Sequence, residues 1–338
     1  MTIHDSHDLE SQVKSATQRF ARSVNTRKDV SLDISELVEA TRKIPLTNLD
    51  YWERLIRSEF CNTISISKPS KFKFWAKPSR ILTWVDLISW DGHKRERALR
   101  TLSGAAPNSF FFTLAIRRLN DWVPQVRQAA RESLPAIANS SDPTLIVDAL
   151  CFTLSNWHSW GRIEQEDKDA LLQIIANDKL SVPLRDKIVS SSSGPMTTLF
   201  SQLGRTPVLD DYFSEIAIRA VQPSVRAKAF RSQFDKKVVW NEGYRWEWVD
   251  KAYGVGKLAP INGVRKIAVD NSFSELLTTS AADSSSIVRR VAAEMLIRNL
   301  EHLDPALNQF AHLFAADKSL AVSERGKFAL KKLKERQH

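Results

Sequence analysis

The sequence predicts an all-α protein in which helical hairpins stack into an α-solenoid. The first observation is that residues 119–137, LNDWVPQVRQAARESLPAI, carry apolar side chains at the three-to-four spacing of one helical face. The second is that this segment recurs several times along the 338 residues of the chain. The third is that other helical segments lie between the copies, and those at 142–154 and 304–314 begin with Asp-Pro, an N-cap followed by a first-turn proline. Helix pairs that repeat every ~30–45 residues are typical of solenoids.

Residues 1–60 are expected to form a helical cap at the N-terminal end of the solenoid. The segments 8–24, 33–44 and 48–60 each show the helical spacing of apolar residues, and the second ends before Pro45. None of the three matches the repeat. A solenoid needs a capping element to cover its open end, and this part of the chain would supply it.

Residues 61–80 are expected to form an extended arm or a β-hairpin. Ile64 and Ile66 alternate with polar residues, as do Phe72 and Phe74, and a period of two is typical of strands. Cations between aromatic side chains suit nucleic acid, where they contact phosphates while the rings stack on bases. The same pattern fits an arm that packs its rings on the body and leaves its cations in water. The candidate nucleic-acid-binding residues are Lys68, Lys71, Lys73, Lys77 and Arg80.

Residues 81–338 are expected to form the solenoid itself. The segment around Arg127 recurs with its arginine and its small or apolar residues at equivalent spacing. The clear copies lie at 91–102, 222–230 and 285–296, and weaker ones lie at 180–189 and 319–330. The alanines inside the clear copies allow a neighbouring helix to approach closely, as stacked helical hairpins require.

One copy of the repeat resembles a known family. Its residues read D-x-x-P-x-V-R-x-x-A between Asp121 and Ala130, and this run resembles the HEAT repeat. The resemblance extends over roughly residues 90–330. It implies a right-handed solenoid in which Asp and Arg side chains form a ladder between neighbouring units, and the planar guanidinium suits this because it can bond a carboxylate and a backbone carbonyl together. The residues implied for the ladder are Asp121, Arg127, Arg226, Asp283 and Arg289.

An aromatic-rich insertion into the solenoid is expected at 238–263. Its aromatic residues lie close together in the sequence, with charged residues between them. An insertion of this kind often forms a contact surface for another protein. It can also fold back so that its indoles fill a gap between repeats, and both interpretations are open at this stage. The candidate protein-binding residues are Trp240, Tyr244, Trp246 and Trp248.

The sequence shows no catalytic or metal-binding constellation. No two histidines stand four residues apart, and neither Cys61 nor Cys151 has a second ligand at metal spacing. We therefore expect no metal, no cofactor and no enzymatic activity. One enzymatic alternative is a resemblance, in basic charge and tryptophan content, to the helical-repeat DNA glycosylases that are built from HEAT-like units. The residues that would serve it are Asp121, Trp122, Trp157 and Trp160.

Composition indicates a folded protein of the cytoplasm. The chain is 43% hydrophobic with a formal net charge of +10, and no run approaches the ~18 apolar residues of a membrane helix. The N-terminal MTIHDSHDLESQ lacks the apolar core of a signal peptide, and two cysteines agree with a reducing compartment. The favoured function is a non-enzymatic scaffold or adaptor that holds a protein partner in a larger assembly. The alternative is a nucleic-acid-binding solenoid with a basic groove, because positive charge attracts phosphates.

Overall fold

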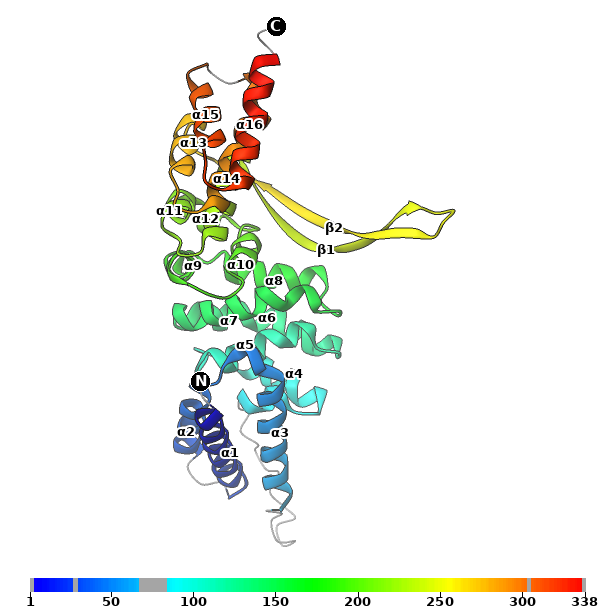
Figure 1. Ribbon diagram of the computed structural model, residues 1–338. Helices are drawn as coiled ribbons and strands as arrows, with labels where there is room; N and C mark the ends of the chain where they lie inside the picture. Colours follow the sequence, from blue (N-terminus) through cyan, green and yellow to red (C-terminus); the bar gives the residue numbers. More distant parts are fainter. Residues whose placement is uncertain (1–2, 27–29, 67–83, 303–304, 336–338) are drawn as a thin grey trace. The chain divides into compact units, whose positions relative to one another are not determined.

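The computed structural model (Figure 1) describes residues 3–26, 30–66, 84–302 and 305–335. The chain divides into two compact units, Met1–Leu180 and Ser181–His338. Both consist mainly of helices, and the second also holds a two-stranded antiparallel sheet. The mostly helical fold is confirmed, and the sheet is an addition to the expected all-α architecture. Within the described ranges, no helix combines the length and the apolar character that crossing a membrane requires.

The first unit holds the helices expected near the N-terminus and the first copies of the repeat. Its α-helices are α1 (Ile3–Thr26), α2 (Val30–Arg42), α3 (Leu49–Ile66), α4 (Gly92–Thr101), α5 (Ser109–Arg117), α6 (Pro124–Ser140), α7 (Pro143–Asn156) and α8 (Gln165–Ile175). Its 3-10 helices are η1 (Leu46–Asn48), η2 (Trp84–Ile88), η3 (Arg118–Asn120), η4 (Trp157–Ser159) and η5 (Asp178–Leu180). The helices expected at 8–24, 33–44 and 48–60 are confirmed as α1, α2 and α3.

Helix α3 corrects the start of the expected arm. Ile64 and Ile66 lie within this helix, so the strand expected for them is wrong. The reason is that Ile64 continues the buried series Trp52, Ile56 and Phe60 at intervals of four residues, on the face that packs against α1. The rest of the arm, with the candidate residues Lys68, Lys71, Lys73, Lys77 and Arg80, lies outside the described residues.

Helix α5 is the apolar centre of the first unit. Its sequence SFFFTLAIR is apolar on nearly every side, and a helix of that kind is stable only where other helices surround it. α5 packs against α2, α3, α6 and α7, and the rings of Phe110, Phe111 and Phe112 are fully buried. The Asn108 side chain caps α5 through the Phe111 N–H and donates to the Val38 carbonyl of α2 at 2.9 Å. This cap joins the N-terminal helices to the repeat helices of the same unit.

Alternate helices of the first unit pack side by side. α4 packs against α6, α6 packs against α8, and α5 packs against α7. In α6 the buried face includes Ala129 and Ala130, whose small side chains permit a close approach. The first-turn proline expected for this helix is Pro124, and that of α7 is Pro143, which follows the capping carboxylate of Asp142.

The second unit repeats this alternation and adds the sheet. Its α-helices are α9 (Ser181–Ser190), α10 (Met196–Leu203), α11 (Phe213–Arg219), α12 (Pro223–Asp235), α13 (Phe273–Ala281), α14 (Ser286–Asn299), α15 (Gln309–Ala315) and α16 (Leu320–Glu335). Its 3-10 helices are η6 (Pro207–Tyr212), η7 (Leu300–His302) and η8 (Pro305–Asn308). α12 packs against α14, and α14 packs against α16. A cluster of buried residues that includes Leu277, Leu296, Phe314 and Val322 joins helices α13, α14, α15 and α16.

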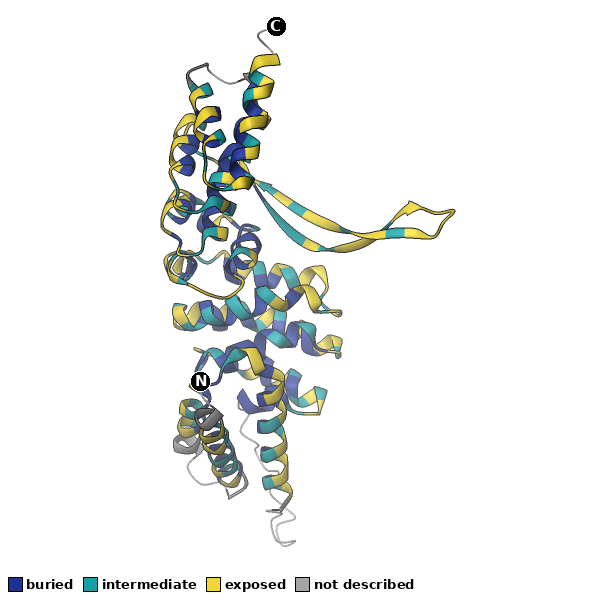
Figure 2. Cartoon of the chain, in the orientation of Figure 1, coloured by how far each residue is buried: buried dark blue, intermediate teal, exposed yellow. Residues whose placement is uncertain are grey.

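A long β-hairpin follows α12 and extends away from the helices of the second unit (Figure 1). Strands β1 (Lys237–Asp250) and β2 (Val255–Lys266) pair antiparallel along their whole length, from Lys237 opposite Lys266 to Asp250 opposite Val255. The turn contains Gly254 at φ +66°, a conformation that glycine adopts without strain. The expected aromatic-rich insertion at 238–263 therefore forms a β-hairpin, with register shifts in β1 at residues 242 and 249. Figure 2 shows that most of its outer part is exposed.

Candidate functional site

Buried arginine–aspartate contacts connect successive helices in the first unit. The Arg95 guanidinium donates from Nε and Nη2 to both carboxylate oxygens of Asp121, each at 2.8 Å. Its Nη1 donates to the backbone carbonyl of Ser89 at 2.8 Å. Arg127 repeats part of this pattern, because its Nη1 donates to the backbone carbonyl of Asp121 at 3.1 Å while its Nη2 reaches Glu164 at 2.6 Å. Each guanidinium thus ties its own preceding loop to an acidic residue further along the chain.

The second unit contains the same contacts. Arg226 donates from Nε and Nη2 to both carboxylate oxygens of Asp283 at 2.8 Å, and from Nη1 to the carbonyl of Ala220 at 2.8 Å. Arg289 pairs in the same way with Asp317 at 2.7 and 3.0 Å, and its Nη1 donates to the carbonyl of Asp283 at 2.9 Å. The arginine–carbonyl spacing is the same in every case, six residues back along the chain.

Not every residue implied for the ladder meets the partner that the sequence suggests. The structure joins Arg226 to Asp283 through their side chains. The carboxylate of Asp121 pairs with Arg95, whereas Arg127 reaches only its backbone carbonyl. In the repeat, Arg95 occupies the position that is equivalent to Arg127. This equivalence is the sequence signal that could have named Arg95 as an arginine that pairs with an acidic residue of the next copy.

These ion pairs leave no open carboxylate at Asp121. Its side chain is 2% exposed. Burial acts to raise the pKa of Asp121, but hydrogen bonds from Arg95 and the Val123 N–H, together with the charge of Arg118, outweigh burial and hold the pKa below its ordinary value. Trp157 is also buried. Asp121 and Trp157 are therefore closed to solvent, whereas Trp122 is 69% exposed and Trp160 lines a surface pocket.

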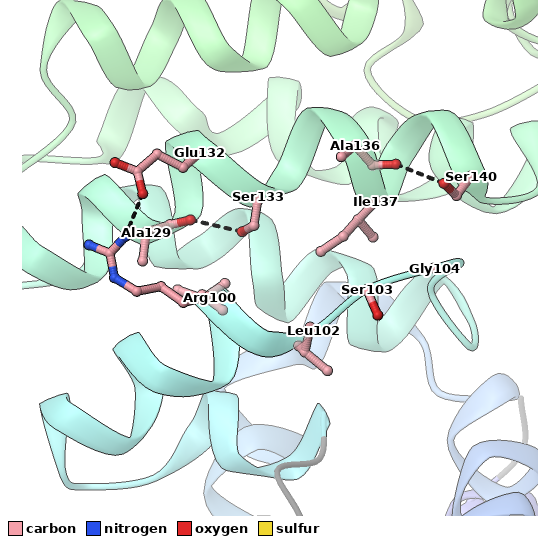
Figure 3. A pocket seen from close by; sticks show the side chains of 11 residues that line it. Arg100, Leu102, Ser103, Gly104, Ala129, Glu132, Ser133, Ala136, Ile137 and Ser140 are labelled. Carbon is pink, nitrogen blue, oxygen red and sulfur yellow. Dashed lines mark hydrogen bonds and ion pairs between the residues drawn. The ribbon is translucent and has the colours of Figure 1, made fainter.

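A pocket of about 350 Å³ lies between α4 and α6 (Figure 3). Within it, Arg100 pairs with Glu132, and the hydroxyls of Ser133 and Ser140 donate to carbonyls one turn earlier in α6. In the described part of the chain, no three His, Cys, Asp or Glu side chains converge as metal ligands would.

One face of the hairpin gathers large apolar side chains away from the helices. Successive side chains of a strand point to opposite faces, so Tyr244, Trp246 and Trp248 share one face of β1. Leu258 and Pro260 lie on the same face, because they are the register partners of Trp246 and Tyr244. The exposed fractions are 63% for Tyr244, 53% for Trp246, 52% for Trp248 and 65% for Leu258. We call Tyr244, Trp246, Trp248, Leu258 and Pro260 the aromatic strip.

Two glycines of β2 give the indoles of β1 room to lie flat on the hairpin. A Cβ atom at Gly256 would stand 2.4 Å from the Trp246 ring, and one at Gly263 would stand 2.2 Å from the Trp240 ring. Each indole therefore covers a strand residue that has no side chain of its own, an arrangement that supports strand pairing. Trp246 and Trp248 also meet edge to face, with ring centres 5.7 Å apart.

Trp240 does not belong to the aromatic strip. It pairs with Gly263, an odd-numbered residue of β2, whereas the strip uses even-numbered residues of that strand. Its indole N–H donates to Glu242 at 3.0 Å, and the Arg205 guanidinium lies 5.1 Å from its ring centre. The structure thus brings three of the four candidate protein-binding residues together and places the fourth at the base of the hairpin.

The base of the hairpin is fixed to the helices. Val238 is fully buried, and the Nζ of Lys228 in α12 donates to the Val239 carbonyl at 2.8 Å. Burial lowers the pKa of Lys228 below its ordinary value. Arg265 donates to both carboxylate oxygens of Asp210 at 2.7 and 2.6 Å. These contacts hold the start of β1 and the end of β2 in place.

Both outer edges of the hairpin are interrupted. The Ile267 N–H donates to the Lys236 carbonyl, and since N–H groups alternate along an antiparallel strand, the odd-numbered residues of β2 point toward β1. Pro260 is even-numbered, so its missing N–H falls on the outer edge of β2. On β1, register shifts at residues 242 and 249 disturb the other edge. Another strand cannot pair along the full length of either edge.

Leu258 and Pro260 are candidate residues that sequence reasoning missed. The signal that could have found them is the strict alternation of Tyr244, Trp246 and Trp248 with charged residues, which has the period of a strand. A strand of this kind needs a second one to pair with, and residues 255–266 follow after a turn containing glycine.

Comparison with protein-family models, with curated proteins and with solved structures finds no match for this chain.

Proposed function

We propose that the protein is a non-enzymatic scaffold or adaptor that binds a protein partner through the aromatic strip. The observation that carries the proposal is that Trp246, Trp248 and Leu258 are each more than half exposed on an element that leaves the helical body. Contiguous exposed apolar surface is unfavourable in water and marks interaction sites. Tryptophan and tyrosine are also the residues that contribute most at protein interfaces.

The distribution of charge on the hairpin favours an apolar protein surface as the partner. The aromatic strip contains no charged residue. On the opposite face, Arg245 forms an ion pair with Glu247 at 2.7 Å, and Lys257 is the register partner of Glu247. Nucleic-acid binding depends on cations that contact successive phosphates. The outer part of the hairpin offers cations that stand beside carboxylates instead.

The interrupted edges favour contact through side chains. Partners that add a strand to a sheet need a free row of N–H and C=O groups. Pro260 removes a donor from the edge of β2, and the register shifts of β1 disturb the other edge. The partner therefore covers the face of the hairpin rather than extending the sheet.

We also propose that the helices of each unit form HEAT-like stacks that serve as the platform for the hairpin. The support is the repeated geometry of the pairs Arg95–Asp121, Arg226–Asp283 and Arg289–Asp317. Their recurrence agrees with the ladder that the resemblance to HEAT repeats implies.

The test is affinity capture with matched variants. The full chain, its Trp246→Ala/Trp248→Ala variant and its Trp122→Ala variant are each immobilised and exposed to an extract of the source cells, with and without nuclease. Trp122 is the control because it is a tryptophan in the first unit that is 69% exposed. We expect a protein that is retained by the parent chain and by Trp122→Ala after nuclease treatment, and whose affinity falls by roughly 30-fold or more in the double variant.

Two results would contradict the proposal. One is that every protein retained by the parent chain is retained equally by the double variant. The other is that all retention disappears after nuclease treatment, since the captured species would then be bound through nucleic acid.

A nucleic-acid-binding solenoid is the second candidate. It is favoured by a cluster in which Arg231, Arg290 and Arg325 all contact the single carboxylate of Glu294, so that positive charge exceeds negative charge on α12, α14 and α16. Its test is the titration of labelled DNA and RNA at rising salt, where phosphate contacts give an affinity that falls log-linearly with salt concentration. Arg290→Glu should then weaken binding, and an affinity without salt dependence would argue against this candidate.

A further inference from the structure

The root of the hairpin carries two lysines on the face of the aromatic strip. Lys237 and Lys266 are register partners, and Lys266 is even-numbered like Leu258 and Pro260. Side chains alternate along β2, so Lys266 lies on the same face as the strip, and its partner Lys237 shares that face. Between the lysines and the strip lie the pairs Val239–Val264 and Asn241–Asn262, which are uncharged.

These two lysines lack the compensation that other charges of the hairpin have. Both are exposed, and none of the described carboxylates forms an ion pair with either. Like charges directly opposite each other in a sheet destabilise it. By contrast, Arg265 is paired with Asp210, and Arg245 is paired with Glu247. On the face of the aromatic strip, the charged side chains of the paired strands are thus confined to the root.

The distance between the two features sets the size of what binds. Trp246 stands nine residues beyond Lys237 in β1, and a strand rises ~3.3 Å per residue, so the cations and the centre of the strip are ~30 Å apart along the hairpin. An extended polypeptide of about ten residues spans that length. A small ligand does not.

We propose that the aromatic strip and the root lysines together bind an extended acidic segment of a protein partner. Apolar side chains of the segment cover Trp246 and Leu258, and its Asp or Glu residues pair with Lys237 and Lys266. The inference rests on the proposed function and adds the chemistry of the partner. A polypeptide fits better than a nucleic acid, because on the face of the strip the cations of the paired strands occur only at the root, while a nucleic acid presents a phosphate at every nucleotide.

The test uses a displayed library of random peptides of about ten residues, the extended length that covers both features. The full chain is the bait, alongside Lys237→Glu/Lys266→Glu and Trp246→Ala/Trp248→Ala. Peptides selected by the parent chain should be enriched in Asp or Glu at one end and in large apolar residues at the other. Synthetic peptides from this pool should bind the lysine variant about ten-fold more weakly, and replacing their acids by Lys should restore binding to that variant.

A matched control separates the effect of where the lysines lie from the effect of net charge. Lys251→Glu/Lys257→Glu changes the net charge of the hairpin by the same amount at its tip and on its opposite face. It should leave the affinity of the selected peptides within about two-fold, since exposed charges far from the contact are screened by salt.

The outcomes separate the two proposals. Selected peptides that depend on Trp246 and Trp248 but show no acidic residues, or that ignore the charge of Lys237 and Lys266, overturn the acidic-segment inference and leave the proposed function standing. A selection that yields no peptide dependent on the two tryptophans overturns both. Tight binding of labelled single-stranded DNA that is lost in the lysine variant also overturns the inference and identifies nucleic acid as the occupant.

Discussion

The two halves of the hairpin share one packing arrangement, an indole on a glycine, but differ in how exposed that indole is. In each half an indole of β1 lies over a glycine of β2, Trp240 over Gly263 at the base and Trp246 over Gly256 in the outer half. Trp240 is partly buried and contacts Arg205, whereas Trp246 is 53% exposed beside another exposed indole. The packing of an indole on a glycine therefore stabilises both halves of the hairpin. Contacts with the neighbouring helices determine that Trp240 is partly buried and that Trp246 remains available to a partner.

The base also explains how the outer half can stay ordered. An isolated two-stranded hairpin is only marginally stable in water. Here Val238, Lys228 and Arg265 fix the start of β1 and the end of β2 to the helices. The register of the outer pairs follows from this anchor, so the strip can be presented without a third strand.

The largest effect is expected from the arginine of the base. Arg265→Met should lower the free energy of unfolding by about 2–3 kcal/mol, because Asp210 and the carbonyls of Gly204 and Thr206 lose their donor in a half-buried site. Arg245→Met, in the outer half, should change it by less than about 0.5 kcal/mol, because Arg245 is 68% exposed and pairs only with its neighbour in the strand. Urea unfolding of both variants measures the difference. Equal losses would mean that the base does not anchor the hairpin.

The loss of two buried methyl groups at the base should destabilise the protein nearly as much as Arg265→Met. Val238→Ala removes two methyl groups from a fully buried position, and we expect a loss of about 2 kcal/mol in the free energy of unfolding. Val264→Ala is the matched control, because Val264 is 55% exposed and its loss should cost less than about 1 kcal/mol. Thermal unfolding compares the stability of the two variants. A larger loss of stability for Val264→Ala would contradict the conclusion that Val238 is buried and Val264 exposed.

The two glycines should separate stability from binding. Gly263→Ala displaces Trp240 from its contacts with Arg205 and should lower the free energy of unfolding by about 1 kcal/mol. Gly256→Ala displaces Trp246 and should affect stability less, but it should weaken partner binding because it reshapes the aromatic strip. Unfolding and binding are measured on both variants. If Gly263→Ala weakens binding more than Gly256→Ala does, the partner contacts the base instead.

The smallest effect is a dependence on pH at the base. Burial lowers the pKa of Lys228 from its ordinary 10.5, so the unfolded chain binds more protons than the folded one in the interval just below that pH. Stability from this group therefore rises as the pH rises through the interval. The stability of the parent chain relative to Lys228→Met should increase as the pH rises toward 10.5, as urea unfolding at each pH would show. Lys257→Met, at the exposed outer half, serves as the control for loss of one charge, and a difference that falls with rising pH would contradict the sign.

Much of the helical part of the fold can be predicted from the sequence. The spacing of apolar residues in 8–24 and 119–137, and the first-turn prolines Pro124 and Pro143, act over a few residues and mark helices whatever surrounds them. The candidate site is only partly predictable. Tyr244, Trp246 and Trp248 can be named from their clustering. Their alternation with charged residues predicts a strand and hence a pairing with the strand that contains Leu258, but the helical periodicity of the rest of the chain favoured an all-α fold.

Most of the helices, the Asp142 cap of α7 and the small residues that let helices pack follow from the sequence alone, because those signals are local and repeat with the period of the secondary structure. Only the tertiary structure decided that Arg95 and not Arg127 holds the carboxylate of Asp121, and that Trp240 is anchored while Trp246 is exposed. The physical reason is separation along the chain. Arg265 and Asp210 are 55 residues apart, and which distant groups meet depends on how the helices pack and not on any local period.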